Sequence, residues 1–237
     1  MKQSLAEKLL QQTEETYNTI AYDFSITRNY VWQDLVPLLD YSRKGDKVLD
    51  LGCGNGRLYE ALKEKQVDYV GCDNSKELIK IAQEKYPEGN FKLTDGLTLP
   101  LKDHSFDIIY CIAVLHHIPS KLLRKKFLLE AKRVLRPNGL LIATVWKLPL
   151  KKRKTALFWF LQRVLGRNSL DFKDCFVAWQ NKYQRYVHNF SKHELKTLFK
   201  SVGFKVKEIK VLAKEKGKNN KTNYNLSIVA LKTSGSF

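Results

Sequence analysis

Three glycines follow an aspartate at the end of an apolar segment, and this spacing predicts a tight ligand-binding turn. The segment 47–50 ends at Asp50, and Gly52, Gly54 and Gly56 follow at every second position. Glycines at such a turn permit a positive φ and let the backbone approach a ligand closely. In dinucleotide-binding loops the turn holds a pyrophosphate, but an acid in front of the glycines repels phosphate and suits an ammonium group. We therefore expect a ligand that carries a positive charge.

Two more acids follow the next predicted strands. Asp73 ends the segment 69–73, where an acid can accept hydrogen bonds from both hydroxyls of a ribose. Asp95 and Gly96 come directly after the segment 91–94. Ligands of open α/β sheets bind beyond the carboxyl ends of the strands. All three acids are thus expected at one site.

This order of motifs resembles the cofactor site of S-adenosylmethionine (SAM)-dependent methyltransferases. SAM has an α-ammonium and a sulfonium and carries no phosphate, which agrees with a glycine loop led by an acid. The resemblance implies that Asp95 and Gly96 hold the adenine amino group, and that Asn74 and Ala113 also contact the cofactor. It implies the class I fold, an α/β Rossmann-like, doubly wound, mostly parallel seven-stranded sheet with a terminal antiparallel hairpin.

The alternation of apolar runs with helical patterns predicts the same architecture. Strands are expected at 47–50, 69–73, 91–94, 106–112, 140–146, 204–213 and 224–232. Helices are expected at 4–17, 31–39, 56–65, 76–86, 121–135, 156–165 and 192–201, with Ser75 and Ser191 as N-caps. Residues 23–28 are predicted as a loop, 136–139 as a turn and 166–190 as an irregular stretch.

We divide the chain into four parts. Residues 1–45 form a helical cap and substrate-entry segment, and residues 46–146 form the SAM-binding core. Residues 147–190 form a basic insertion that faces the substrate, and residues 191–237 form a helix and hairpin that complete the sheet.

Positive charge is concentrated late in the chain, whose formal net charge is +18. Residues 1–146 hold 21 Lys and Arg against 19 Asp and Glu, whereas residues 147–221 hold 20 against 5. Such a field attracts polyanions, and the run Lys151, Lys152, Arg153 and Lys154 lies within it. The distribution favours nucleic acid as a partner.

Three further segments resemble the tRNA methyltransferases that esterify 5-carboxymethyluridine at the wobble position, a family that includes the methyltransferase part of the AlkB-homologue fusion enzymes. The first matching segment holds Tyr17, Asn18, Ile20, Ala21, Phe24, Ser25, Thr27, Arg28 and Trp32. The second is Ile112–His117, and the third comprises Val177, Trp179, Arg185, Tyr186, His188, Phe190, Glu194 and Leu195. The chain departs from the family at Ala178, where a Pro is usual, and at Asn74, where an Arg is common.

The resemblance implies roles for these residues. Arg28 and Arg185 are candidates to grip a carboxylate or a phosphate, because a guanidinium fork fits either group. His116 and His188 would orient the base, and His116 is favoured over His117 for the pocket. Substrate contacts are expected from Trp32 and Tyr186, which could stack on the base, and from Lys151, Lys152, Arg153 and Lys154.

Other readings of the sequence remain open. A small-molecule O- or C-methyltransferase of quinone or secondary-metabolite type shares the cofactor motifs but leaves the basic segment unexplained. A catalytically silent RNA-binding subunit would not need intact cofactor motifs. An arsenic methyltransferase would need convergent cysteines, and the cysteines near the sheet ends lie within the cofactor motifs instead.

The remaining features concern location and partners. Four scattered cysteines without a C-x-x-C pair indicate reduced thiols and no zinc site or other metal centre. No apolar run is long enough to span a membrane, and the N-terminus has no apolar signal core. A cytoplasmic protein is expected, with tRNA as a partner. Eukaryotic relatives also require a small zinc-binding activator protein.

Overall fold

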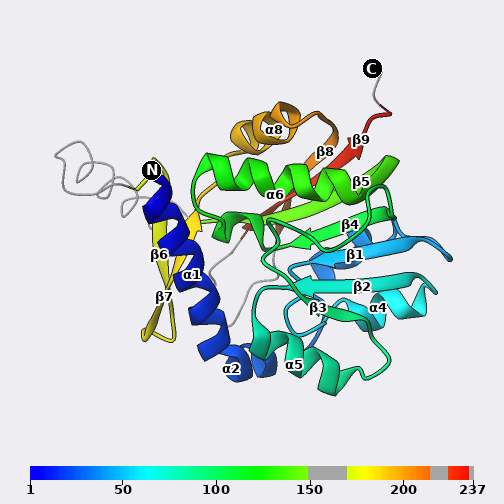
Figure 1. Cartoon of the computed structure of the whole chain (residues 1–237), viewed down its shortest axis with the longest axis horizontal. Coiled ribbons are helices and arrows are strands. Elements are labelled where there is room, and N and C mark those ends of the chain that lie inside the picture. The colour runs from blue at the N-terminus through cyan, green and yellow to red at the C-terminus, as the bar shows by residue number, and fades with distance from the viewer. Residues whose placement is uncertain (149–169, 214–223, 235–237) are drawn as a thin grey trace.

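The computed structural model describes residues 1–148, 170–213 and 224–234. Its main sheet has seven strands in the order β3-β2-β1-β4-β5-β9-β8 (Figure 1). They are β1 (Lys47–Leu51), β2 (Asp68–Asp73), β3 (Phe91–Leu93), β4 (Phe106–Ile112), β5 (Leu135–Lys147), β8 (Phe204–Ala213) and β9 (Tyr224–Lys232). The first five strands of this order, β3, β2, β1, β4 and β5, pair in parallel, and β9 is antiparallel to β5 and β8. The predicted fold class, with its terminal hairpin, is confirmed.

Helices cover both faces of this sheet because alternate residues of each buried strand point to opposite sides. Leu49 of β1 and Ile109 of β4 belong to one core cluster, with α6 (Lys121–Val134) and α8 (Lys192–Ser201). Val48 and Ile108, the preceding residues, belong to a second cluster with α3 (Val36–Leu39), α4 (Tyr59–Glu64) and α5 (Lys76–Lys85). The strand order reverses between β1 and β4, so a crevice is expected at their carboxyl ends.

The caps of two helices agree with the prediction. The Ser75 hydroxyl accepts a hydrogen bond from the Leu78 backbone N–H at the start of α5. The Ser191 hydroxyl accepts one from the Glu194 N–H at the start of α8. Each cap satisfies a backbone donor that the first turn of a helix leaves free.

The N-terminal segment is more helical than predicted. Helix α1 (Gln3–Thr19) is followed, after one residue, by α2 (Ala21–Thr27), so the expected loop at 23–28 is wrong. The Thr27 hydroxyl donates to the Asp23 carbonyl within α2. Threonine is often found in loops, but this hydrogen bond to the preceding turn accommodates Thr27 in the helix. A 3-10 turn, η1 (Gln33–Leu35), then leads into α3.

Two other expectations need correction. The segment 174–188 is not irregular, because β6 (Asp174–Trp179) and β7 (Tyr183–His188) form an antiparallel two-stranded sheet beside α1 (Figure 1). The predicted turn 136–139 lies inside β5, where the pairing with β4 shifts register between Leu135 and Leu140. The predicted helix 156–165, the basic run 151–154 and the connection 214–223 between the last two predicted strands lie outside the described residues. The four-part division of the chain stays a prediction.

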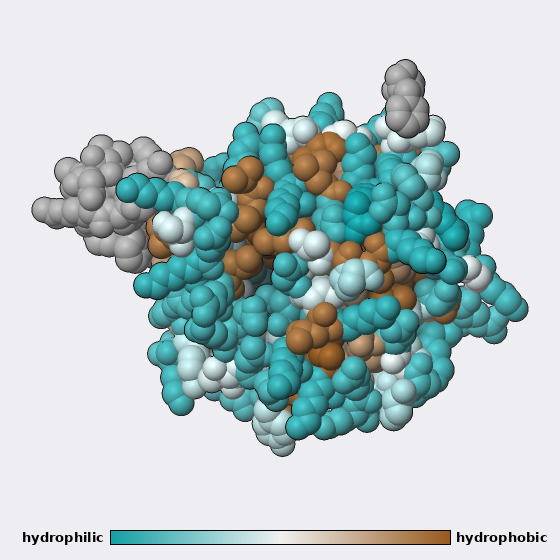
Figure 2. Space-filling model, in the orientation of Figure 1, coloured by the Kyte–Doolittle hydropathy of each residue, from teal (hydrophilic) through white to brown (hydrophobic). Residues whose placement is uncertain are grey.

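Hydrophilic side chains cover most of the face shown in Figure 2, and apolar ones form patches between them. Within the described ranges, no helix is both long and apolar enough to cross a membrane. The four cysteines, Cys53, Cys72, Cys111 and Cys175, are buried and free.

Candidate active site

The main pocket opens at the carboxyl ends of β1, β2 and β4, where the strand order reverses. The glycine loop after β1, the ends of β2 and β4, α1, α2 and one residue of β7 contribute to its walls. Of the predicted cofactor residues, the pocket lining includes Gly52, Gly54, Asp73, Asn74, Asp95, Gly96 and Ala113. The crevice is therefore where the sequence placed it.

Gly52 and Ala113 both line the pocket, and both have a positive φ. Gly52 has φ +86°, and a Cβ there would lie 2.1 Å from a methyl carbon of Val114. Ala113 has φ +61°, and its N–H donates to both the carbonyl and the hydroxyl of Thr144, each at 3.0 Å. The result is an open backbone cradle of the kind that approaches a ligand closely.

Asp73 connects the end of β2 to the glycine loop. Its carboxylate accepts hydrogen bonds from the Gly54 N–H at 2.8 Å and from the Ser75 N–H at 2.9 Å. Burial raises the pKa of Asp73, and these N–H donors oppose the rise. The carboxylate lines the pocket and has lone pairs left for the hydroxyls of a ribose.

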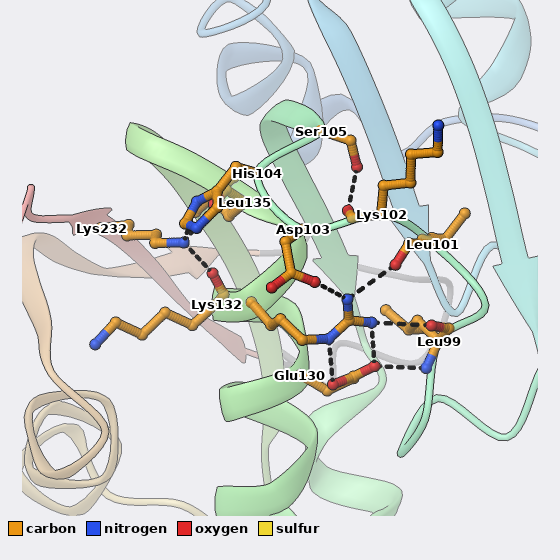
Figure 3. Close-up of polar contacts among 11 residues, drawn as sticks. Leu99, Leu101, Lys102, Asp103, His104, Ser105, Glu130, Lys132, Leu135 and Lys232 are labelled. Carbon is orange, nitrogen blue, oxygen red and sulfur yellow. Dashed lines mark hydrogen bonds and ion pairs between the residues drawn. The ribbon is translucent and has the colours of Figure 1, made fainter.

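The opposite end of the pocket is formed by the loop after β3, which carries Asp95 and Gly96. The Asp95 carboxylate accepts from the backbone N–H groups of Leu97 and Thr98. Further along, Arg133 of α6 donates to the carbonyls of Leu99 and Leu101, and to the carboxylates of Asp103 and Glu130 (Figure 3). Glu130 in turn accepts from the Leu99 N–H, so this network clamps the loop to α6.

Asp50 does not line the pocket, which corrects its predicted direct contact with the ligand. It is 1% exposed beneath the glycine loop, and its carboxylate accepts a hydrogen bond from the Tyr69 hydroxyl at 3.0 Å. Burial raises the pKa of Asp50 to about 7, against the opposing effects of Tyr69 and Arg57. Its charge can act on a pocket cation only through space. Gly56 also lies outside the lining, and its φ of +75° serves the turn.

Three arginines converge on the other side of the pocket. Arg28 follows α2, Arg57 follows the glycine loop and Arg185 lies on β7, and all three line the pocket. Burial lowers the pKa of Arg28, and the neighbouring charge of Arg185 lowers it further. Burial also lowers the pKa of Arg57, to about 10. Cations held this close together need an anion.

Tryptophans hold these guanidinium groups in place. Arg185 lies 4.9 Å from the ring centroids of both Trp146 and Trp179, and Arg28 lies 5.5 Å from Trp179. Arg57 lies 4.3 Å from Trp32, which also lines the pocket. A cation over an aromatic face is attracted by the ring without using its hydrogen-bond donors. Within the described ranges, Arg185 Nε and Arg57 Nη1 are buried without a hydrogen-bond partner.

The histidine pair differs from the prediction by one residue. His117 lines the pocket, and His116 lies behind Trp146 with its ring 4.6 Å from the indole. The pair follows β4 in a 3-10 turn, η2 (Leu115–His117), which directs the two rings differently. Burial lowers the pKa of both imidazoles, in His117 to about 3. Both rings are therefore neutral at physiological pH.

Two residues of β7 lie away from the pocket. His188 is enclosed between the carboxylates of Asp174 at 2.6 Å and Glu194 at 2.7 Å, which ties β7 to β6 and α8. Tyr186 is 2% exposed and belongs to a small core cluster beneath α1. Neither side chain is among those that line the pocket. This corrects the predictions that His188 orients the substrate and that Tyr186 stacks on it.

Sequence reasoning gave no role to several residues that line the pocket. Arg57 directly follows the glycine motif, so its position was a usable signal. Tyr17 was part of a matched motif without an assigned role, Trp146 was given no role, and His117 was set aside for its neighbour. Trp179, which contacts two of the arginines, was also matched without a role. Lys151, Lys152, Arg153 and Lys154 lie outside the described residues.

The geometry suits SAM. The exposed backbone of Gly52 and Gly54 leaves room for an amino-acid tail, and the Asp73 carboxylate offers acceptors for the hydroxyls of a ribose. Beyond Asp95, the apolar lining residues Leu97, Ile118 and Phe127 fit an adenine ring. The pocket therefore has a place for each part of the cofactor and, beside the arginines, for an anionic substrate.

Comparisons with known proteins agree with this assignment. Residues 49–143 match the family model described as a methyltransferase domain. The tRNA (carboxymethyluridine(34)-5-O)-methyltransferase of Schizosaccharomyces pombe is 30% identical over 207 residues, which cover 82% of this chain and 89% of that protein. The chain spans about a third of the length of plant and mammalian relatives that it also matches.

Solved structures show the same fold. A SAM-dependent methyltransferase from Methanosarcina mazei has a TM-score of 0.73 and 22% identity, with 83% of this chain and 97% of that chain covered. A putative methyltransferase from Haloferax volcanii, solved in complex with the Trm112 methyltransferase activator, has a TM-score of 0.69 and 18% identity, with 95% and 99% covered. The chain belongs to the tRNA (carboxymethyluridine(34)-5-O)-methyltransferase family, and its domain is that of a class I SAM-dependent methyltransferase.

Proposed function

We propose that this chain transfers a methyl group from SAM to the carboxylate of 5-carboxymethyluridine at the wobble position of tRNA. The observation that carries the proposal is the convergence of Arg28 and Arg185 beside the cofactor pocket, with Arg185 Nε left unpartnered. A guanidinium fork grips a carboxylate through two parallel hydrogen bonds. The family relationship supports the same acceptor.

The reaction requires little acid–base catalysis from the protein. Bound SAM supplies a methyl group on a positively charged sulfur. The acceptor carboxylate, with a pKa near 4 by analogy with other carboxyls, is already ionised at neutral pH. The pKa of His117, lowered to about 3, makes it a poor base, which agrees with chemistry that removes no proton. The arginines fix the carboxylate oxygen in line with the methyl group, and the aromatic walls exclude water.

The remaining predicted contacts extend this proposal. Trp32 lines the pocket beside Arg57, and we expect it to contact the uracil ring. Lys151, Lys152, Arg153 and Lys154 would contact phosphates of the tRNA. If they do, neutralising all four should flatten the salt dependence of tRNA binding, because each phosphate contact releases counterions. SAM affinity should stay the same.

The test is methyl transfer to an anticodon stem-loop that carries 5-carboxymethyluridine, with an unmodified uridine stem-loop as control. We expect product only with the carboxymethyl substrate, detected by mass spectrometry of nucleosides. Mild alkali should remove the new methyl group, because it is an ester, whereas a methyl group on a ring atom or hydroxyl would survive. Transfer to the unmodified stem-loop would contradict the proposal. Alkali-stable product would do so as well.

An activator protein is a second partner to propose, because a structural neighbour was solved with the Trm112 methyltransferase activator. The assay should be run with and without an activator of this kind. A rise in kcat or in thermal stability on its addition would support the partnership. No change in either would contradict it.

A further inference from the structure

A chain of two hydrogen bonds connects α1 to the backbone of β7 through His117. The Tyr17 hydroxyl of α1 lies 2.9 Å from His117 Nε2, and His117 Nδ1 lies 2.8 Å from the Tyr186 carbonyl oxygen. Tyr186 directly follows Arg185 on β7. The chain therefore ends on the backbone beside Arg185.

The direction of every link follows from the chemistry of its two ends. A carbonyl oxygen can only accept, so His117 must carry its proton on Nδ1. In a neutral imidazole, Nε2 is then the acceptor, and the Tyr17 hydroxyl donates to it. The low pKa of His117 keeps this arrangement at all physiological pH values.

Packing reinforces the same geometry. The Tyr17 ring meets the His117 ring edge to face, with centroids 5.4 Å apart, and meets Phe24 of α2 at 5.6 Å. Arg185 is 5% exposed and lies against two indole rings. One of these indoles, that of Trp146, also meets the His117 ring, with centroids 5.2 Å apart. Within the described residues the Arg185 Nε has no hydrogen-bond partner and is left for another acceptor. Buried donors cost free energy until such an acceptor arrives.

We propose that Tyr17 and His117 are positioning residues that orient Arg185 toward the acceptor carboxylate, with His117 acting as a neutral hydrogen-bond acceptor and not as a base. The inference rests on the proposed function for the identity of the acceptor. It assigns a role to His117 that excludes proton transfer. It also explains why α1 takes part in a site whose chemistry lies at the sheet edge.

The first test is kinetic. Tyr17→Phe keeps the ring and removes the hydroxyl, and we expect about a tenfold loss in kcat/KM for the carboxymethyluridine stem-loop with unchanged SAM affinity. In an Arg185→Lys background the same substitution should cost less than twofold, because the residue that it orients is already lost. Tyr22→Phe, on the exposed side of α2, is the matched control and should change neither quantity. If the losses in kcat/KM of the two single variants multiplied fully in the double variant, the proposal would be overturned.

The second test does not depend on the RNA substrate. Nitrogen-15 NMR of the histidine rings reports which nitrogen carries the proton. We expect His117 as the Nδ1–H tautomer from pH 6 to 8, and we expect the Arg185 Nε–H resonance to shift in Tyr17→Phe. A protonated Nε2 on His117, or an unchanged Arg185 resonance, would overturn the proposed positioning of Arg185. If the wild-type protein did not methylate the stem-loop while both NMR results held, the proposed function would fail and the positioning role of Tyr17 and His117 would stand.

Discussion

Two groups of arginines in this molecule are built in opposite ways. Arg133 lies on α6 with two carboxylates and two backbone carbonyls around it (Figure 3). Its hydrogen bonds to the carboxylates of Glu130 and Asp103 raise its pKa. Arg28, Arg57 and Arg185 face the pocket, where aromatic rings surround them. Burial lowers the pKa of both Arg28 and Arg57.

The difference separates a structural charge from one that awaits a ligand. A paired, hydrogen-bonded cation stabilises the fold that surrounds it. A desolvated cation beside like charges costs free energy, and sites that keep such a cost are commonly functional. Arg133 clamps the loop after β3 to α6, whereas we propose that the pocket arginines supply charge for an anion. Variants of the two groups should therefore fail in different assays.

The largest effect is expected at Arg185. Arg185→Lys keeps the charge but loses the fork, so kcat/KM for the stem-loop should fall about 100-fold or more, the cost of one or two charge-assisted hydrogen bonds. Arg28→Lys should behave alike if it shares the carboxylate. Thermal unfolding should change little, because the wild-type cations are poorly compensated. A variant that lost stability and kept its rate would place Arg185 with Arg133.

A smaller effect is expected at Asp73. Asp73→Asn keeps the shape and replaces one acceptor oxygen with an NH₂ group, so SAM affinity should fall about 30-fold, or about 2 kcal/mol. Calorimetric titration with SAM measures it directly. Glu88→Gln, an exposed carboxylate that pairs with Lys63, is the control and should leave the affinity unchanged. Equal affinity in Asp73→Asn would remove Asp73 from the ribose site.

Asp50 should make the affinity for SAM depend on pH, with a change of about tenfold. In the free protein its raised pKa, about 7, means that the folded state holds a proton that the unfolded chain releases near pH 4. The contribution of Asp50 to the stability of the ligand-free protein therefore falls as the pH rises from about 4 to 7. A cation in the pocket favours the ionised carboxylate. SAM should thus bind about tenfold more weakly at pH 5.5 than at pH 7, with proton release on binding. A flat profile in wild type, or the same slope in Asp50→Asn, would contradict this.

The features that the sequence predicted best are those that a short local pattern determines. The apolar run Phe106–Ile112, the N-caps at Ser75 and Ser191, and the glycine turn are set by neighbouring residues, and they appear where expected. Their physical causes, side-chain burial and the satisfaction of backbone donors, act over a few residues.

What it missed depends on tertiary contacts. Strand β7 buries Arg185 and His188 because tryptophans and carboxylates from other elements meet them, so its polar residues gave no strand pattern. The choice between His116 and His117 depends on the direction of a single 3-10 turn. The arginine cluster draws on α2, the glycine loop and β7, which only the folded chain brings together.

The smallest effect on catalysis, and the clearest on stability, is expected at Arg133. Its neighbour Glu130 has a lowered pKa, chiefly because Arg133 hydrogen-bonds to its carboxylate. A lowered carboxyl pKa contributes stability above the unfolded value of about 4.5, and that contribution is lost as the pH falls below it. Arg133→Met should therefore lower Tm by a few degrees at pH 7 and by less at pH 4, which lies below the unfolded pKa, so that part of the contribution is already lost. At a temperature where the variant is folded, its rate at saturating SAM should match wild type, because no arginine of the pocket has changed. A loss of rate at saturating SAM in the folded variant would mean that the two arginine groups are coupled, and that the clamp on the cofactor loop also positions the acceptor.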